Sequence, residues 1–333
     1  MGAQLTTISD RLQIVELADS TATNDFAEDV RAGLGGVRKR LSAKYFYDDL
    51  GSALFDAITR LPEYYLTRAE TEILHEWGWE IVRELDAPLE FLELGSGSAA
   101  KTRLLIEEAL RVQGALRYSP IDISLEALRA SAVTLVEAYP RLHIRAYAGD
   151  YFAVLGSSQL RFEGKALAMF MGSNLGNYHP DEARKLLSLI SAALRPGDGL
   201  LLGVDLKKDR TVLELAYDDP TGVTAAFNRN ILGRINRDLG GHFAVNDFAH
   251  IATYDEVRGC VDSFLRAGRA QSVPIDALGI TVDFEAGELI HTESSYKFDD
   301  ATLAALAAAG GFRPKKKWQD RGDRFAVQLF VKE

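Results

Sequence analysis

The sequence predicts an α/β protein whose mainly parallel sheet is covered by helices on both faces and closed by an antiparallel hairpin. From residue 89 to residue 206, short apolar runs typical of strands alternate with patterns typical of helices. This alternation stops between residues 207 and 290, and strand patterns return before the C-terminus. Because strands that alternate with helices form parallel sheets with helices on both faces, the interruption is predicted to be an insertion.

The first strand and the loop after it lie in the stretch LEFLELGSGSAAKT, from Leu89 to Thr102. Pro88 and Gly95 bound the apolar run, as expected for a buried strand. Gly95 and Gly97 permit backbone angles and close approaches that a side chain forbids. Leucine and alanine recur at helical spacing from Lys101 to Gln113. The stretch is therefore predicted to form a strand, a glycine-rich ligand-binding loop and a helix.

Two classes of ligand use such a loop, and a dinucleotide is one of them. Gly95, Gly97 and Ala100 satisfy the loose pattern G-x-G-x-x-[GA], in which a pyrophosphate lies at the helix N-terminus. The pattern alone is a weak signal. The acid at the end of the second strand, Asp122, comes later than the roughly 20-residue spacing of the dinucleotide fingerprint. An NAD-dependent oxidoreductase is therefore the less favoured interpretation.

S-adenosylmethionine (SAM) is the other candidate, and acids at successive strand ends favour it. Glu93 precedes the loop, Asp122 ends the strand in YSPIDI, and Asp150 and Tyr151 follow the next strand. Asp122 suits ribose hydroxyls, whereas Asp150 and Tyr151 offer an acceptor and an aromatic face to adenine. Capping of the next helix explains any single acid equally well. Their joint placement favours a cofactor that contains a nucleoside.

The remaining elements of the sheet domain follow from apolar periodicity and turn residues. Pro196 to Gly199 end one helix, and Arg321-Gly322-Asp323 form the turn of the closing hairpin. The expected elements are a helix over 124–137, strands over 143–148 and 166–171, a helix over 181–194, a strand over 200–206, a helix over 301–309, and strands over 316–319 and 325–331. The N-terminal region, up to about residue 69, precedes the first predicted sheet strand.

Composition and charge exclude several functions. A net charge of −10 is unsuited to a nucleic-acid surface, which needs clustered lysine and arginine. The single cysteine, Cys260, excludes an internal disulfide framework and fits a reducing compartment. No apolar run reaches the roughly 18 residues of a membrane helix, and the six histidines lack metal-site spacing. We expect a cytoplasmic, monomeric protein that holds no metal and acts on a small molecule.

Several long motifs give the chain a resemblance to a known family. They run along nearly the whole chain, in the order KYFYDDLGSALFDAITRLPEYYLTRAE, LELGSGSAAKT, YSPIDIS, MGSNLGNYHP, LAYDDPTGVTAAFNRNIL and HTESSYKF. On these motifs the chain resembles the histidine-specific, SAM-dependent N-α-methyltransferases, which make hercynine for ergothioneine biosynthesis. The resemblance implies SAM as cofactor and a Rossmann-like, class I SAM-methyltransferase sheet with its C-terminal antiparallel hairpin.

The resemblance also implies a division into two domains. Residues 70–206 and 296–333 form the SAM-binding methyltransferase domain. Residues 1–69 and 207–295, the N-terminus and the late insertion, form a substrate-recognition domain. The two regions without strand and helix alternation fall where this division requires them.

Individual residues receive roles from the same resemblance. SAM is held by Gly95, Lys101, Asp122, Asp150 and Tyr151. The amino-acid substrate is bound by Tyr47, Tyr64, Asn177, Tyr217, Glu293 and Ser295. Asn177 and Tyr217 hold the carboxylate and amine region, and Tyr47 lies near the amine as the catalytic residue. Tyr64, Glu293 and Ser295 face the imidazole.

Glu293 is the expected specificity residue. A buried carboxylate opposite an imidazole N–H makes a charge-assisted hydrogen bond, and such a pocket rejects side chains that leave the acid unpaired. HTESSYKF also alternates like an ordinary edge strand, in which Glu293 would face water. The residues alone favour that second interpretation, and the resemblance reverses the preference.

One position departs from the family pattern. Where the family has a pocket methionine, this chain carries Ser263, in the segment GCVDSFLRA. A smaller residue widens the ring pocket, which leaves open a larger aromatic substrate such as tryptophan, or a methylated derivative. A non-catalytic module that binds SAM and an amino acid is a further alternative. It is disfavoured because the residues of both half-sites are complete.

Methyl transfer from a sulfonium is an in-line displacement, so the attacking amine must be uncharged. A carboxylate beside the nitrogen would stabilise the unreactive ammonium. Tyrosine hydroxyls and water, which orient a neutral amine and pass its proton to solvent, fit better, and Tyr47 is the natural candidate. Three successive transfers would give the trimethylammonium product, although the sequence does not fix their number.

Overall fold

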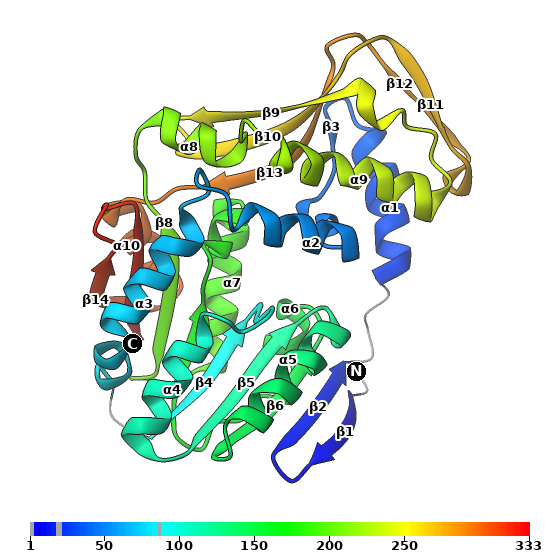
Figure 1. Cartoon of the computed structure of the whole chain (residues 1–333). Helices are drawn as coiled ribbons and strands as arrows, with labels where there is room; N and C mark the ends of the chain where they lie inside the picture. The colour runs from blue at the N-terminus through cyan, green and yellow to red at the C-terminus, as the bar shows by residue number, and fades with distance from the viewer. Residues whose placement is uncertain (1–2, 18–21, 86–87) are drawn as a thin grey trace. The chain divides into compact units, whose positions relative to one another are not determined.

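Residues 3–17, 22–85 and 88–333 are described by the computed structural model of the chain. The chain folds into two compact units (Figure 1). Unit 1 comprises Met1–Ser20, Arg68–Leu206 and Phe298–Glu333. Unit 2 comprises Thr21–Thr67 and Lys207–Lys297. Each unit is therefore assembled from segments that lie far apart in the sequence.

A nine-stranded sheet forms the centre of unit 1 in the described part of the chain, with the order β1-β2-β6-β5-β4-β7-β8-β15-β14. The strands are β1 (Ala3–Ser9), β2 (Leu12–Leu17), β4 (Leu89–Leu94), β5 (Leu116–Asp122), β6 (Leu142–Ala148), β7 (Lys165–Phe170), β8 (Gly199–Asp205), β14 (Phe312–Gln319) and β15 (Phe325–Lys332). The strands from β2 to β8 pair in parallel, whereas β15 pairs antiparallel with both β8 and β14. The predicted α/β sheet with its closing hairpin is confirmed.

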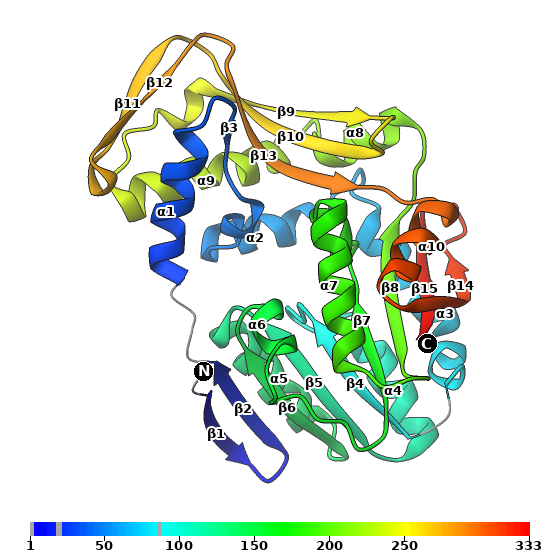
Figure 2. The same ribbon diagram turned by 180° about the vertical axis from the view of Figure 1, so that it is seen from behind.

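Helices cover both faces of this sheet. They are α3 (Leu66–Arg83), α4 (Thr102–Gln113), α5 (Leu125–Ala138), α6 (Tyr151–Leu155), η2 (Asn174–Asn177), α7 (Pro180–Ala193) and α10 (Asp300–Ala309). Helices α3 and α4 lie in front of the sheet in Figure 1, and α7 and α10 lie in front of it in Figure 2. Every residue of β4 and β8 is buried, as expected for parallel strands covered on both sides. The carboxyl ends of β4, β5 and β6 therefore meet at one edge of a covered sheet.

The N-terminal segment differs from the prediction that the first 69 residues precede the sheet and belong with the insertion. Strand β2 pairs in parallel with β6, with Leu12 opposite Ile144, and β1 pairs antiparallel with β2. Leu12, Ile14 and Val15 are almost fully buried. The hairpin therefore extends the sheet of unit 1, and only the part of the N-terminal region from Thr21 to Thr67 joins the insertion in unit 2.

Unit 2 contains a four-stranded sheet of order β3-β13-β10-β9 and a separate pair, β11-β12. Its elements are α1 (Ala22–Leu34), β3 (Lys39–Arg40), η1 (Ala43–Phe46), α2 (Asp49–Ile58), α8 (Arg210–Tyr217), α9 (Val223–Leu239), η3 (Val245–Asp247), β9 (Phe248–Asp255), β10 (Cys260–Ala267), β11 (Gln271–Ile275), η4 (Asp276–Leu278), β12 (Ile280–Phe284) and β13 (Leu289–Tyr296). Helices α8 and α9 pack against β9 and β10. Alternate residues of β10 and β13 consequently face these helices or the open side of the sheet.

No helix among the described residues is both long enough and apolar enough to cross a bilayer.

Candidate functional site

Gly95 begins the loop after β4, and its backbone adopts a φ of 73°. A β-carbon at this position would lie 2.5 Å from the hydroxyl oxygen of Tyr151. Any side chain would therefore require Tyr151 to move, in addition to the strain of a positive φ. The structure brings together two of the predicted cofactor residues, from the ends of β4 and β6, and glycine is the residue that permits their approach.

Asp122, at the end of β5, holds this loop in place. One carboxylate oxygen accepts a hydrogen bond from the N–H of Gly97 at 3.0 Å, and the other accepts from the N–H of Ser124 at 3.0 Å. The carbonyl of Asp122 accepts from the N–H of Gly149, after β6, at 2.9 Å. The ends of three neighbouring strands are thus joined through one residue.

Asp150 and Tyr151 open helix α6. The Asp150 carboxylate accepts from the N–H of Phe152 at 2.8 Å and caps the helix. This is the structural role that any acid at a strand end can have. The Tyr151 ring packs edge-on against Phe170, with centroids 5.9 Å apart.

Lys101 forms an ion pair with Glu70, a residue that the sequence did not single out. Glu70 is fully buried and also accepts from the N–H of Gly172 at 2.8 Å. The pairing holds the Lys101 ammonium beside the loop that follows β7. Glu70 lies 31 residues earlier in the chain, and no local pattern signals a partner at that distance.

Glu93 lies at the end of β4, directly before the loop, and is buried. It accepts hydrogen bonds from the hydroxyls of Thr102 and Tyr118. Burial raises the pKa of Glu93 to about 7, against the opposing effect of the two hydroxyls. The carboxyl group therefore changes its protonation state close to neutral pH, directly behind the glycine-rich loop.

The residues at this edge of unit 1 fit a SAM molecule. Gly95 lets the loop backbone lie close to the Tyr151 hydroxyl, an approach that a β-carbon would block. Asp122 and Asp150 present carboxylates at the ends of adjacent strands, which suit ribose hydroxyls and an adenine amine. Among the described residues, no group of three or more histidine, cysteine, aspartate or glutamate side chains is arranged to hold a metal ion.

In unit 2 a row of aromatic rings connects three of the predicted substrate residues. Tyr47 packs edge-on against Phe55 and Phe227, with centroids 5.6 and 5.7 Å apart. Phe55 in turn contacts Tyr64 at 6.1 Å, and Tyr64 contacts Tyr217 at 6.4 Å. The row runs from Tyr47 through Phe55 and Tyr64 to Tyr217. Phe55 and Phe227 are not among the predicted site residues, because phenylalanines at helical spacing are typical of a core.

The polar end of this row is supplied by β13. The Tyr217 and Ser295 hydroxyl oxygens lie 2.8 Å apart, and the Lys297 ammonium donates to both of them. Glu293 lies two residues before Ser295, on the same face of the strand. Burial raises the pKa of Glu293, and the positive charges of Lys297 and His291 oppose this rise.

Tyr47 lies within electrostatic range of this polar end. Desolvation of its hydroxyl, together with the nearby Glu293 and Tyr217, raises the pKa of Tyr47. Even so, 47% of the residue's surface is exposed, so a ligand can reach it. Tyr47 therefore remains a neutral phenol at any physiological pH and is unsuited to act as a strong base.

The backbone of Tyr217 is held by a buried histidine. Since a carbonyl only accepts, the His250 Nε2–H donates to the Tyr217 carbonyl at 2.7 Å. Nδ1 then accepts from the Asn228 side-chain amide at 2.7 Å. Burial lowers the pKa of His250 and keeps the ring neutral, in the tautomer that both hydrogen bonds require.

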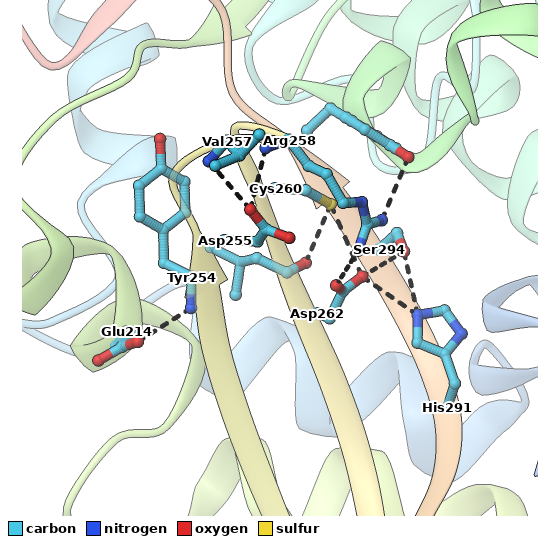
Figure 3. Close-up of polar contacts among 11 residues, drawn as sticks. Glu214, Tyr254, Asp255, Val257, Arg258, Cys260, Asp262, His291 and Ser294 are labelled. Carbon is cyan, nitrogen blue, oxygen red and sulfur yellow. Dashed lines mark hydrogen bonds and ion pairs between the residues drawn. The ribbon is translucent and has the colours of Figure 1, made fainter.

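The other face of β13 carries a separate polar cluster, drawn in Figure 3. Asp262 accepts from Arg258 and from Ser294, both at 2.6 Å, and His291 Nε2 lies 3.3 Å from the same carboxylate. Burial of Asp262 is outweighed by these hydrogen bonds, which lower its pKa to about 2. Although aspartate, histidine and serine meet here, the serine proton goes to the aspartate, so the histidine does not activate a nucleophile. The cluster fastens β13 to β10.

Asn177 is the one predicted substrate residue that lies outside unit 2. It is exposed at the end of η2 in unit 1. The structure therefore brings together Tyr47, Tyr64, Tyr217, Glu293 and Ser295 within one unit, and the five predicted cofactor residues, with Asn177, within the other.

Comparisons with known proteins find relatives that match nearly the whole chain. The profile of a family described as "Histidine-specific methyltransferase, SAM-dependent" matches residues 26–332. The chain is 41% identical over 316 residues to a histidine N-alpha-methyltransferase of Mycolicibacterium smegmatis, covering 95% of this chain and 98% of the relative. It is 43% identical over 305 residues to a protein of the same name from Mycobacterium tuberculosis, covering 91% and 94%. Ergothioneine biosynthesis protein 1 of Schizosaccharomyces pombe is 27% identical over 305 residues, which are 89% of this chain and 39% of the fungal protein.

Proposed function

Because the chain belongs to the family of histidine-specific, SAM-dependent methyltransferases, we propose that it methylates the α-amino group of L-histidine. Three successive transfers would yield N-α-trimethylhistidine, hercynine, as the first step of ergothioneine biosynthesis. The observation that carries the proposal is the hydrogen bond between the Tyr217 and Ser295 hydroxyls, whose oxygens lie 2.8 Å apart. Glu293 lies on the same face of the strand as Ser295.

Unit 1 is proposed to hold SAM, which supplies an electrophilic methyl group on a sulfonium. Asp122 would accept from ribose hydroxyls, and Asp150 with Tyr151 would surround the adenine. Gly95, which already lets the loop backbone lie close to the Tyr151 hydroxyl, would allow the same close backbone approach to the cofactor. Lys101, held by the buried Glu70, would complete the cofactor end of the site.

Unit 2 is proposed to hold the amino acid. Glu293 would accept from an imidazole N–H, and this hydrogen bond favours the ionised carboxylate against the effect of burial. A ring that offered no N–H would leave the acid unpaired in a buried site, which is costly. Ser295 would contact the same ring, and Tyr217 would hold the carboxylate and amine region.

Tyr47 is proposed to orient the amine. Its raised pKa keeps the hydroxyl protonated, so it hydrogen-bonds to a neutral amine and does not remove the proton of an ammonium. That proton leaves to water. Positioning supplies much of the acceleration, because well-oriented reactants recover roughly 7 to 11 kcal/mol of a bimolecular barrier.

A larger aromatic amino acid, such as tryptophan, is the second candidate substrate. Ser263 lies directly opposite Glu293 in the β10–β13 pair and is buried. Its small side chain favours a wider ring pocket than a larger residue would leave.

The test is an assay of the purified chain with SAM and a panel of the common amino acids, read by mass spectrometry. We expect histidine to gain successive methyl groups with release of S-adenosylhomocysteine. Methylation of tryptophan but not histidine would overturn the specificity alone. Absence of methylation on every amino acid would overturn the enzymatic function.

A further inference from the structure

Lys297 is a buried lysine directly after β13, and none of the roles above uses it. Glu293, Ser295 and Lys297 occupy alternate positions, and residues at alternate positions of a strand share a face. The side chain of Lys297 is almost fully buried. Its backbone N–H donates to the Gly259 carbonyl at 2.7 Å, which anchors the residue after the end of the strand.

The Lys297 ammonium contacts the two hydroxyls that join α8 to β13. Nζ lies 2.7 Å from the Tyr217 hydroxyl and 2.9 Å from that of Ser295. It also lies 4.4 Å from the centroid of the Tyr217 ring. Three contacts therefore fix one charged group against the two side chains that are proposed to touch the substrate.

The direction of these hydrogen bonds follows from the donors available. An ammonium only donates, so Tyr217 and Ser295 both accept from Lys297. The bond between the two hydroxyls uses one of their two hydrogens. At least one hydroxyl hydrogen of the pair is consequently directed away from the pair and from the lysine.

We propose that Lys297 is a positioning residue that turns the Tyr217 and Ser295 hydroxyls into donors toward the amino-acid substrate. The proposal rests on the proposed function. With Glu293 as acceptor and the hydroxyl pair as donor, the strand offers complementary partners to a ring that has one N–H and one unprotonated nitrogen. Neutral imidazole is such a ring.

Lys297 also acts on Glu293 through charge. The charges of Lys297 and His291 act on Glu293, and Glu293 and Tyr217 in turn act on Tyr47. Lys297 and His291 lower the pKa of Glu293, in opposition to burial. Removing the lysine charge should therefore raise the pKa of Glu293 and protonate it at a higher pH.

The test uses the full-length Lys297→Met variant, which keeps the length of the side chain and removes its charge and donors. Calorimetry with S-adenosylhomocysteine present measures histidine binding from about pH 5 to about pH 9, a range chosen to cover a histidine side chain and a glutamate whose pKa is raised by burial. We expect the dissociation constant for histidine to rise about tenfold at neutral pH. We also expect the loss of binding on acidification to begin at a higher pH than in the wild type, whereas S-adenosylhomocysteine binding stays within about twofold.

Lys39→Met is the matched control in the same unit. Lys39 pairs with Glu288, outside the proposed site, so this variant should bind histidine like the wild type. Lys297→Arg restores the charge and the donors. In this variant, the pH at which histidine binding is lost on acidification should return toward the wild-type value. If Lys297→Met does not fold, Lys297→Gln is used, which removes the charge and keeps an N–H donor. It should likewise lose histidine binding at a higher pH than the wild type.

Three results for Lys297→Met would overturn the inference. They are unchanged affinity for histidine, loss of histidine binding at the same acidic pH as in the wild type, or equal losses of affinity for histidine and for S-adenosylhomocysteine. Titration of free histidine is common to all variants and cancels in the comparison. Wild-type protein that binds and methylates histidine, with an unaffected Lys297→Met variant, contradicts the inference alone. Wild-type protein that does not bind histidine contradicts the proposed function and the inference together.

Discussion

Ser263 and Glu293 lie directly opposite each other in the antiparallel pair of β10 and β13. Directly opposed residues of such a pair point to the same face, with β-carbons about 4.5 to 5.5 Å apart. Ser263 is buried and its carbonyl accepts from the Thr292 hydroxyl at 3.0 Å. The size of the side chain at position 263 therefore sets how much space lies beside the Glu293 carboxylate.

The Ser263→Met variant should narrow this space. We expect it to raise the ratio of kcat/KM for histidine over tryptophan by about tenfold, because a few methylene groups in a pocket discriminate by roughly 1 to 3 kcal/mol. Mass spectrometry of competing amino acids measures the ratio. Ser272→Met, on β11 beside Asp283, is the matched control, and a ratio that falls or stays constant in Ser263→Met would count against a ring pocket at this position.

Replacing Glu293 should separate histidine recognition from cofactor binding. We expect Glu293→Ala to weaken histidine binding by about tenfold to one-hundredfold, since a hydrogen bond to a charged group is worth about 1.5 to 3 kcal/mol. SAM affinity should stay nearly constant in the same calorimetric titrations. Glu288→Ala, just before the same strand and paired with Lys39, is the control.

The pH dependence of histidine binding has a defined sign. The pKa of Glu293 is raised by burial, so the carboxylate protonates at a higher pH than an ordinary glutamate, whose pKa is about 4.3. Wild-type binding should weaken as the pH falls through this raised pKa. Glu293→Gln should bind histidine more weakly at neutral pH, and its binding should not weaken further as the pH falls through this range. If its binding weakened on acidification as in the wild type, a group other than Glu293 would be the one that titrates.

Tyr47→Phe should reduce methylation by about tenfold, the scale of one lost hydrogen bond in a reacting complex. SAM binding should change by less, because Tyr47 lies in unit 2. Single-turnover rates and SAM titration provide the two readouts. Tyr45→Phe, two residues earlier, removes a hydroxyl that donates to Asp29 at 2.7 Å and should affect stability only. Equal losses of rate and of SAM affinity in Tyr47→Phe would contradict the role in orienting the amine.

The sheet was predictable where its signal is local. The strand before Gly95, the loop and the alternating helices follow from apolar periodicity within short windows, and the structure confirms them. The N-terminal hairpin was missed because its parallel pairing joins Leu12 to Ile144. Strand partners that far apart leave no trace in either segment, and the alternation of strand and helix begins only at residue 89.

The same distinction applies to the candidate site. Gly95, Asp122 and Asp150 could be proposed from the sequence because loops at strand ends carry ligand-binding groups. Glu70 and Lys297 were missed, since an isolated acid in a helix and a lysine after a strand look like solvated surface. Only the fold buries them and supplies their partners, Lys101 for Glu70 and the Tyr217–Ser295 pair for Lys297.

Glu93 should make stability depend on pH near neutrality. Its folded-state pKa of about 7 exceeds the ordinary value of 4.5, so its contribution is fully present below about pH 4.5 and is lost as the pH rises through about 7. Relative to Glu93→Gln, which does not titrate, the wild type should lose up to about 3 kcal/mol across this range. Chemical denaturation at a series of pH values measures the difference.

Asp262→Asn is a control whose stability should depend on pH in the opposite direction. The pKa of Asp262 is lowered to about 2, so its contribution to stability is present above the unfolded pKa and is lost as the pH falls toward 2. The stability of Asp262→Asn should therefore approach that of the wild type on acidification. A Glu93→Gln difference that stays flat with pH, or grows in favour of the wild type as pH rises, would contradict the assigned pKa.

The measurement that tests the account most directly is the position of the methyl groups on the product, determined by NMR after incubation of the wild-type protein with SAM and histidine. If Glu293 and Ser295 hold the imidazole while Tyr47 orients the amine, every methyl group lies on the α-nitrogen and both ring nitrogens remain unmethylated. A product methylated on a ring nitrogen would contradict the account, because the group that unit 2 is proposed to hold by hydrogen bonds would then be the group that reacts.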